Sequence, residues 1–403
     1  MTAQVIDVII VGAGMSGLTL ANLLARQGRS LAIVDRCLPA EFDPSGPSHA
    51  RVTAVSPGSK TIFEYTGVWS GIKEKRVMEF KKMVVWDEAS TASIKFFAED
   101  MSQPCLGYIV ENSIIQSTLY EALQKISGIQ WCVPGSVENV SCHDHEIEVT
   151  LTDNQVLRAK LLVGADGSRS AIRHLAGISY TETPYHQLGI VAKVHTELPH
   201  ECTAWQRFLK TGPLALLPAG GEGAHHECSI VWSADSEYAS QLMRMDDRNF
   251  EQEVTRASGQ QLGKVTLKSK RASFSLASGQ AQALVKPRVA LIGDAAHTIH
   301  PLAGQGANLG LTDVAVLADT LAGSKRDLGS YRLLRVYERA RKGEVHVMQH
   351  AMSAFAAVFS TSSLPAIVAR SAALSLADHS LPLKRFFMKQ AMGLSSDRPV
   401  FAR

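Results

Sequence analysis

Three short segments that combine glycine with an acidic residue contain the groups in this chain best suited to bind a nucleotide. They lie at 12–17, 164–167 and 293–297, and each directly follows an apolar run. Glycine lets the backbone approach a phosphate closely, and a carboxylate can accept hydrogen bonds from sugar hydroxyls. Ligands of open α/β sheets bind beyond the carboxyl ends of the strands, so the three segments are predicted to meet at one crevice.

The first segment predicts a strand, a tight turn and a helix that together hold a dinucleotide pyrophosphate. Its glycines, Gly12, Gly14 and Gly17, have the GxGxxG spacing. They allow the turn, the approach of the phosphates and the packing of the helix, whose positive N-terminus faces the anion. A second apolar run at 31–34 ends in a carboxylate suited to the ribose. The predicted contacts are Gly12, Ala13, Gly14, Met15, Ser16, Gly17, Asp35 and Arg36.

The other two segments favour FAD over NAD as the ligand. Asp166 and Asp294 add two carboxylates, which suit a cofactor with further hydroxyl groups. After Asp294 the chain continues through a glycine-rich run to Gly310, whose backbone could lie against a flat ring. A helix starting near Gly306 would direct its N-terminus at the negative edge of that ring. Asp166 has an alternative interpretation, as the cap of a helix that starts near Ser168.

Composition indicates an ordinary globular protein. The chain has 403 residues, 45% of them apolar and 20% charged, with a net charge of +3. This charge is too small and dispersed to favour nucleic-acid binding, and no apolar run approaches the ~20 residues of a spanning helix. The six cysteines are far apart and indicate a cytoplasmic protein without disulfides. We expect no metal site, because the spacing of His346 and His350 fits a solvated helix face better than a ligand pair.

The order of the elements predicts an α/β fold with a discontinuous Rossmann-like FAD-binding domain. A mainly antiparallel β-sheet substrate domain is inserted into it, and the C-terminus is helical. We place the FAD-binding domain at 1–75, 105–180 and 280–350, the substrate domain at 76–104 and 181–279, and the C-terminal helical region at 351–403. One helix, about 236–256, is expected within the inserted sheet.

At these residues the chain resembles the class A flavin-dependent aromatic hydroxylases over nearly its whole length. The resemblance is carried by the GxGxxG turn, by Gly164–Arg173 and by the Gly-Asp element at 293–313. Four further segments are similar to the ubiquinone-biosynthesis hydroxylases, and the run at 297–306 agrees with them. These segments are 51–57, 107–112, 205–218 and 229–233.

The resemblance assigns roles by position. Arg51 would approach the flavin side of the cofactor, and Asp294 the ribityl or pyrophosphate region. Pro301 would lie where the flavin faces the substrate, as the single catalytic candidate. Gln116 stands where many relatives have an arginine near the phosphates, so charge-assisted pairing would be lost there. The remaining cofactor contacts would be Gly293, Gly304, Gln305, Gly306, Ala307 and Asn308.

The implied reaction hydroxylates the ring of a polyprenylated phenol or quinol through a flavin C4a-hydroperoxide formed from NAD(P)H and O₂. No second GxGxxG exists for the nicotinamide cofactor, so NAD(P)H would visit the same crevice. Trp205 and Phe208 would either pack the inserted sheet or line the ring pocket, and Leu216 and Pro218 are further substrate-binding candidates. The alternatives are a hydroxylase of another small aromatic compound, a flavoprotein reductase of prenyl lipids, and a flavin-bound scaffold without chemistry.

A lipid-borne substrate requires some route out of the membrane. The apolar stretch 351–394, with scattered basic residues, predicts either helices that cover the sheet or a surface that meets a bilayer or a partner. We therefore expect a cytoplasmic protein that contacts the inner membrane peripherally, or that joins other ubiquinone-biosynthesis proteins in a complex.

Overall fold

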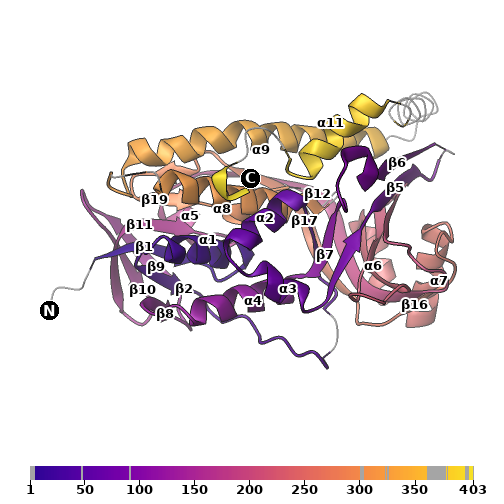
Figure 1. The fold of residues 1–403 in the computed structure, drawn as a ribbon, viewed down its shortest axis with the longest axis horizontal. Helices are drawn as coiled ribbons and strands as arrows, with labels where there is room; N and C mark the ends of the chain where they lie inside the picture. Colours follow the sequence, from indigo (N-terminus) through magenta and orange to yellow (C-terminus); the bar gives the residue numbers. More distant parts are fainter. Residues whose placement is uncertain are drawn as a thin grey trace.

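A computed structural model describes residues 5–46, 49–89, 92–299, 304–322, 324, 326–360, 378, 380–394 and 399–402. The molecule is elongated, with a mainly parallel sheet at one end and an antiparallel sheet at the other (Figure 1). Two long helices, α8 (Gln305–Ala322) and α9 (Tyr331–Ser360), lie along one side. This arrangement agrees with the predicted α/β class.

The first sheet is built on five parallel strands in the order β19-β11-β1-β2-β8. Its inner strands are almost wholly apolar, as expected for parallel strands that are buried in a core on both faces. Three antiparallel strands, β18, β10 and β9, extend it. The strands are β1 Ile6–Val11, β2 Leu31–Val34, β8 Ile129–Cys132, β9 Val137–Cys142, β10 Ile147–Leu151, β11 Val156–Gly164, β18 Val285–Lys286 and β19 Val289–Leu291.

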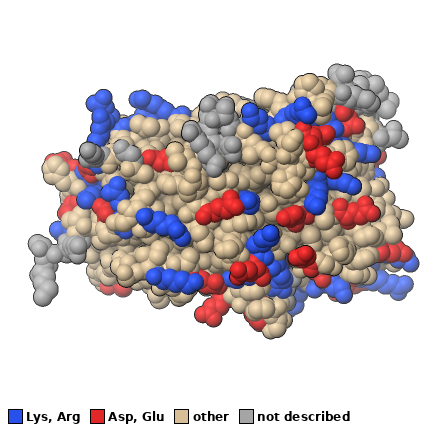
Figure 2. All heavy atoms as spheres, in the orientation of Figure 1, with Lys and Arg blue, Asp and Glu red and all other residues tan. Residues whose placement is uncertain are grey.

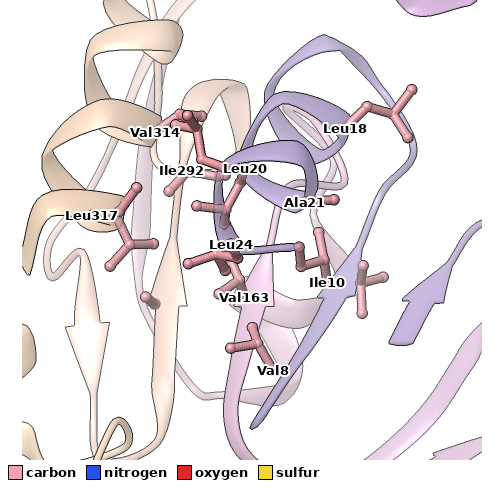
Figure 3. Packing of buried hydrophobic residues seen from close by; sticks show 14 of the residues in the cluster. Val8, Ile10, Leu18, Leu20, Ala21, Leu24, Val163, Ile292, Val314 and Leu317 are labelled. Atoms are coloured by element: carbon pink, nitrogen blue, oxygen red, sulfur yellow. The ribbon is translucent and has the colours of Figure 1, made fainter. Parts of the chain in front are cut away.

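Helix α1 (Met15–Arg26) packs between this sheet and α8, and forms the centre of the main core. Leu20 and Leu24 of α1 point toward Val163 of β11 and toward Val314 and Leu317 of α8 (Figure 3). The spacing of these apolar residues along α1 places them on one face. Helix α4 (Asn112–Gln124) covers another part of α1.

The second sheet has nine strands in the order β20-β17-β12-β15-β14-β13-β5-β6, with β16 on β12. All its pairings are antiparallel except that of β13 with β5. The strands are β5 Lys82–Asp87, β6 Ser93–Phe97, β12 Tyr180–Thr196, β13 Thr203–Leu209, β14 Gly212–Pro218, β15 Glu227–Asp235, β16 Val265–Leu267, β17 Ala272–Ala281 and β20 His297–Thr298.

A small antiparallel sheet, β3-β7-β4, joins the two ends of the molecule. Its strands are β3 Val52–Val55, β4 Val77–Phe80 and β7 Gly107–Glu111. The buried carboxylate of Glu111 lies 3.6 Å from Nζ of Lys193 on β12. The hydroxyl of Ser229 on β15 also donates to the carbonyl of Ala50, at 3.0 Å. The face of the nine-stranded sheet that carries Lys193 and Ser229 therefore faces the nucleotide side.

Short helices complete the chain, and one expectation about them is wrong. The predicted single helix at 236–256 is two helices, because Asp246 caps a new helix by accepting a bond from the amide of Asn249 at 2.7 Å. The C-terminal region is helical where it is described, and 361–377 lies outside the described residues. The remaining helices are α2 Pro57–Tyr65, α3 Trp69–Lys73, η1 Ala98–Met101, α5 Ala171–Leu175, α6 Ser236–Arg244, α7 Asp247–Ala257, η2 Gly293–Ala295, α11 Leu381–Ala391 and η4 Val400–Ala402.

Sheet membership follows the predicted domain boundaries closely but not throughout. β4 belongs to the predicted substrate segment 76–104, yet it pairs with β7 in the small connecting sheet. β20 belongs to the predicted FAD-binding segment 280–350, yet it pairs with β17 of the nine-stranded sheet. The division into domains stays a prediction.

We predict that Tyr337→Phe lowers the free energy of unfolding by about 1–2 kcal/mol. Tyr337 is fully buried in α9 and its hydroxyl donates to the carbonyl of Leu291 in β19 at 2.7 Å, so the substitution leaves a buried acceptor unpaired. Urea denaturation measures the change. Tyr331→Phe on the same helix, where the ring is 47% exposed, is the control, and a similar loss there would contradict the prediction.

Candidate cofactor site

The first glycine turn has the geometry that the sequence predicts. Gly12 has a φ of +114°, and a Cβ atom on it would lie 2.3 Å from the carbonyl oxygen of Ala165. A Cβ on Gly17 would lie 1.9 Å from the carbonyl oxygen of Gly12, so only glycine lets α1 approach the turn this closely. A Cβ on Gly14 would meet nothing within 4 Å, so its surroundings are open. The turn is therefore closed on the sheet side and open where a ligand would lie.

The N-terminus of α1 has the features of an anion-binding site. No side chain caps it at Gly14, and its first turn contains no acidic residue. Met15 and Ser16 therefore begin the helix with amide groups directed toward the open side of the turn. A phosphate placed there would gain both hydrogen bonds and the positive end of the helix dipole.

Asp35 lies at the end of β2 against the same turn. Its carboxylate accepts hydrogen bonds from the backbone amide of Ala13, at 2.5 Å, and from that of Arg36, at 2.6 Å. These bonds fix the carboxylate beside the turn and leave part of it toward solvent, where it can accept a bond from a sugar hydroxyl.

The first and third glycine segments are brought into contact, as the sequence predicts. A Cβ on Gly293 would lie 2.8 Å from Oγ of Ser16, at the start of α1. A Cβ on Gly310 of α8 would lie 3.1 Å from Cα of Gly293 and 3.2 Å from the same Oγ. The N-terminal parts of α1 and α8 therefore meet at one point, where Gly293, with a φ of +59°, and Gly310 leave little room for a side chain.

Asp294 lies in the short turn η2, directly after β19. Its side chain is exposed to solvent, yet the protein atoms around it are dense enough to desolvate it and raise the pKa of its carboxyl, against the smaller effects of His297 and Arg51. A group that is both surrounded by protein and open to solvent is expected in a ligand cavity.

A second aspartate, which the sequence analysis did not single out, holds this turn in place. The Asp313 side chain is fully buried, and its Oδ2 accepts bonds from the amide of Gly293 at 3.0 Å and pairs with Nε2 of His297 at 2.7 Å. Its Oδ1 accepts from Nε of the buried Arg341 in α9 at 2.6 Å. Burial alone would raise the pKa of Asp313, but His297 and Arg341 more than offset this and lower it.

The start of α8 is fixed to the small sheet by Asn308. Its amide nitrogen donates to the carbonyl of Ala54 at 2.9 Å, and its carbonyl oxygen accepts from the amide of Ser56 at 3.0 Å. Its side chain is thus used by the protein, and any contact with a cofactor would come from the helix N-terminus. Gln305 donates to the carbonyl of Ala391, at 3.4 Å. Pro301, the predicted catalytic residue, lies outside the described residues.

The structure also describes Arg51, Gln116 and Asp166, which the sequence predicts to contact the cofactor. Arg51 is exposed, and its guanidinium lies 5.3 Å from the ring centre of Phe274 on β17. Gln116 is half-buried on α4, which packs against α1. The carboxylate of Asp166 accepts bonds from the hydroxyl of Ser170 at 2.5 Å and from the amide of Ile172 at 3.1 Å. Asp166 therefore supports the first turn of α5, but the N-cap of that helix is Ser170, and a cofactor contact by Asp166 stays a prediction.

The predicted substrate residues fall on opposite faces of the nine-stranded sheet. Trp205 and Leu216 are directly paired on β13 and β14 and pack into the cluster under α6 and α7. Strand alternation puts Pro218 on that face as well. Phe208 packs instead with Val85 and Ile94, on the other face. Of the four, only Phe208 lies on the face that carries Lys193 and Phe274, so a substrate contact by the others stays a prediction without support from their placement.

Neither a metal site nor a membrane span is found within the part of the chain that the structure describes. Its residues contain no group of three or more His, Cys, Asp or Glu side chains arranged to hold a metal ion. None of its helices combines the length and hydropathy that crossing a bilayer requires.

Comparison with known proteins identifies the nucleotide for which this site is built. Residues 5–351 match the family described as FAD binding domain. The chain belongs to this family. Its open glycine turn and the carboxylate of Asp35 are compatible with a dinucleotide of this kind, and FAD is the cofactor.

Two curated relatives match along nearly the whole chain. The 3-demethoxyubiquinol 3-hydroxylase of Escherichia coli is 36% identical, over 98% of this chain and 100% of that protein. Ubiquinone hydroxylase UbiL of Rhodospirillum rubrum is 33% identical, over 97% and 90%. The crystal structure of PqsL, a probable FAD-dependent monooxygenase of Pseudomonas aeruginosa, superposes with a TM-score of 0.76 at 22% identity, over 92% of this chain and 100% of that one. The FAD-dependent monooxygenase class predicted from the sequence is confirmed.

We predict that Gly310→Ala weakens FAD binding and lowers stability by about 1–3 kcal/mol. The new methyl group would meet the Cα of Gly293 at 3.1 Å, and backbone there cannot move without shifting the cofactor turn. Gly343→Ala in α9 is the matched control. Nothing lies within 4 Å of its Cβ position, so it should leave FAD binding unchanged and stabilise the helix by about 0.5–1 kcal/mol. Flavin fluorescence titration and thermal unfolding measure both effects, and equal FAD affinity in the two variants would contradict the prediction.

We predict that Asp313→Asn lowers the free energy of unfolding at neutral pH by about 2–4 kcal/mol, because the buried Arg341 would keep only the half-exposed Glu344 as its counter-charge. A carboxyl whose folded pKa is lowered contributes stability above its unfolded pKa of about 3.9 and loses it as pH falls through the folded value. The wild type should therefore lose stability more steeply in acid than the variant does. Asp247→Asn, in a pair with Arg271 whose carboxyl side is 76% exposed, should change stability by no more than about 0.5 kcal/mol. Parallel acid limbs for wild type and Asp313→Asn would refute the assignment.

Proposed function

We propose that this protein is an FAD-dependent monooxygenase that hydroxylates the aromatic ring of a polyprenylated phenol or quinol in ubiquinone biosynthesis. The observation that carries the proposal is the near full-length similarity to ubiquinol and ubiquinone hydroxylases, which continues through the nine-stranded sheet as well as the cofactor turns. A shared cofactor site alone would support only a flavoprotein. Similarity across the sheet that faces the cofactor supports a shared substrate class.

The chain's own residues would bind and orient the cofactor. The amides at the start of α1 would take the pyrophosphate, Asp35 the adenosine ribose, and Asp294 the ribityl or pyrophosphate region. The glycine-rich start of α8, from Gly304 to Asn308, would lie against the flavin ring. Bound FAD supplies the transfer of electrons from NAD(P)H to O₂ and of one oxygen atom to the substrate ring.

Asp313 would act on the cofactor site through the backbone. By holding the amide of Gly293 and the ring of His297, it fixes the turn on which Asp294 stands. Phe274 and the face of the nine-stranded sheet that carries Lys193 and Ser229 would exclude water from the side of the site opposite the parallel sheet. Pro301 remains the residue proposed to lie between flavin and substrate.

The substrate's chemistry suggests where the protein works. We propose a cytoplasmic enzyme that meets its polyprenylated substrate at the inner membrane, by peripheral contact or within a complex of ubiquinone-biosynthesis proteins. NAD(P)H would visit the flavin crevice and leave, since the sequence has no second dinucleotide turn.

We predict that Gly14→Val abolishes FAD retention and hydroxylation together, because the side chain would occupy the open space in front of the α1 amides. The purified protein is incubated with FAD, NAD(P)H, O₂ and a short-chain prenylated phenol, and the product is analysed by mass spectrometry. Gly28→Val is the matched control, because nothing lies within 4 Å of its Cβ either and it lies at the far end of α1. Its positive φ makes some loss of stability expected, without loss of flavin.

The same assay separates the rival functions. Incorporation of one oxygen atom from O₂ into the product supports the proposed reaction. Turnover of the prenylated substrate under strict anaerobiosis would instead show a reductase. Rescue of quinone synthesis in a deletion strain by the flavin-free Gly14→Val protein would show a scaffold, and either result would overturn the proposal.

A further inference from the structure

The C-terminal helix α11 (Leu381–Ala391) combines a buried anchor with an exposed aromatic surface. Met388, and Met392 just beyond the helix, are buried in a cluster with Ala98 and Leu106. On the outer side Phe386 is 58% exposed and the adjacent Phe387 is 52% exposed. Two neighbouring phenylalanines that are each more than half exposed form an apolar patch, and such patches are often sites of interaction.

All the charged residues of α11 are basic. α11 contains Lys384, Arg385 and Lys389 and no acidic residue. Lys384 is buried and pairs with Asp378 at 3.1 Å, and Arg385 donates to the carbonyl of Asp100 at 2.8 Å. Lys389 is exposed and contributes the charge that an external partner would meet. In Figure 2, blue and red side chains are interspersed around the upper right, where α11 lies in Figure 1. The surface around the helix is therefore of mixed charge, and the excess of positive charge is confined to α11 itself.

The inner end of α11 is bonded directly to the cofactor side. The carbonyl of Ala391 accepts the bond from Gln305 at the start of α8, and that of Met392 accepts from the amide of Gly58 in α2 at 3.0 Å. At 1.5 Å per residue, Phe387 is only about 6 Å along the helix axis from Ala391. The exposed rings therefore lie about one turn away from Ala391, which contacts Gln305 at the start of α8.

We infer that the outer face of α11 is a docking surface for an anionic phospholipid bilayer, into whose interface Phe386 and Phe387 insert. Aromatic rings favour the interfacial region of a bilayer, and basic side chains beside them favour anionic headgroups. The inference rests on the proposed function, since a polyprenylated substrate gives the enzyme its reason to meet a membrane. Docking here would bring the start of α8, which we propose lies against the flavin ring, close to the level of the headgroups.

The test measures binding of the full FAD-loaded protein to vesicles by sedimentation, without substrate. Vesicles of phosphatidylcholine alone are compared with vesicles that also contain phosphatidylglycerol. We expect the wild type to prefer the anionic vesicles. Phe386→Ser combined with Phe387→Ser should lower the partition coefficient at least about tenfold on both, because roughly half of each ring is available for burial.

A single charge change gives an independent readout. Lys389→Gln should lower binding to the anionic vesicles about fivefold and leave binding to neutral vesicles unchanged, as expected for one basic residue near a charged surface. The matched control is Val156→Ser with Leu198→Ser, which removes two exposed apolar side chains (42% and 49% exposed) outside α11. This control should bind like the wild type, and all variants should keep FAD and their melting temperature.

Three results would overturn the inference. They are the absence of wild-type binding to either vesicle, binding by the double phenylalanine variant that equals the wild type, and a change in oligomeric state caused by that variant. The last result would show that the surface receives a second copy of the chain. Vesicle binding without hydroxylation would refute the proposed function and leave the docking surface supported. Hydroxylation of a soluble analogue without vesicle binding would support the proposed function and refute the docking surface.

Discussion

The cofactor side of the structure depends on one buried carboxylate. Asp313 has no contact with solvent, so its charge is tolerated only because Gly293, His297 and Arg341 surround it with donors. These three residues come from the turn after β19, from β20 and from α9. The ionised Asp313 side chain therefore links the parallel sheet, the antiparallel sheet and the long helices at one point. It also fixes the position of Asp294, which follows Gly293 directly in the chain.

Close backbone contacts provide the second constraint. The turn at Gly12 touches the segment at Ala165, and the turn at Gly293 touches Ser16 and Gly310. A single methyl group at Gly12, Gly17 or Gly310 would separate elements that now lie at van der Waals distance. Electrostatic pairing and glycine contacts act together here. The carboxylate of Asp313 orients the turn at Gly293, and because glycine has no side chain that turn can approach the start of α1.

Local sequence patterns were sufficient to predict much of this arrangement. The apolar run before Gly12 and the spacing of its glycines are properties of a few consecutive residues, and so is the run before Gly293. Asp313 could not be recognised in the same way, because Arg341 lies on another helix and Gly293 lies 20 residues earlier. The faces of Trp205 and Phe208 could not be assigned either, because the register of β13 against β14 and β5 decides which side of the sheet each residue occupies. The break between α6 and α7 was readable in principle, from Asp246 followed three residues later by Asn249.

The contact between Gly58 and Gly393 has a consequence for the biosynthesis of the chain. A Cβ on Gly58 would lie 2.6 Å from the carbonyl oxygen of Gly393, so residues near the two ends of the sequence are packed backbone to backbone. The parallel sheet has the same character, since β1 pairs with β11 and β11 with β19 across more than a hundred residues each. A ribosome releases the N-terminal turn long before the strands that flank it exist. The flavin pocket therefore cannot be completed before the segment around Gly293 has been synthesised, and until then the partly made chain must keep its apolar strands from aggregating.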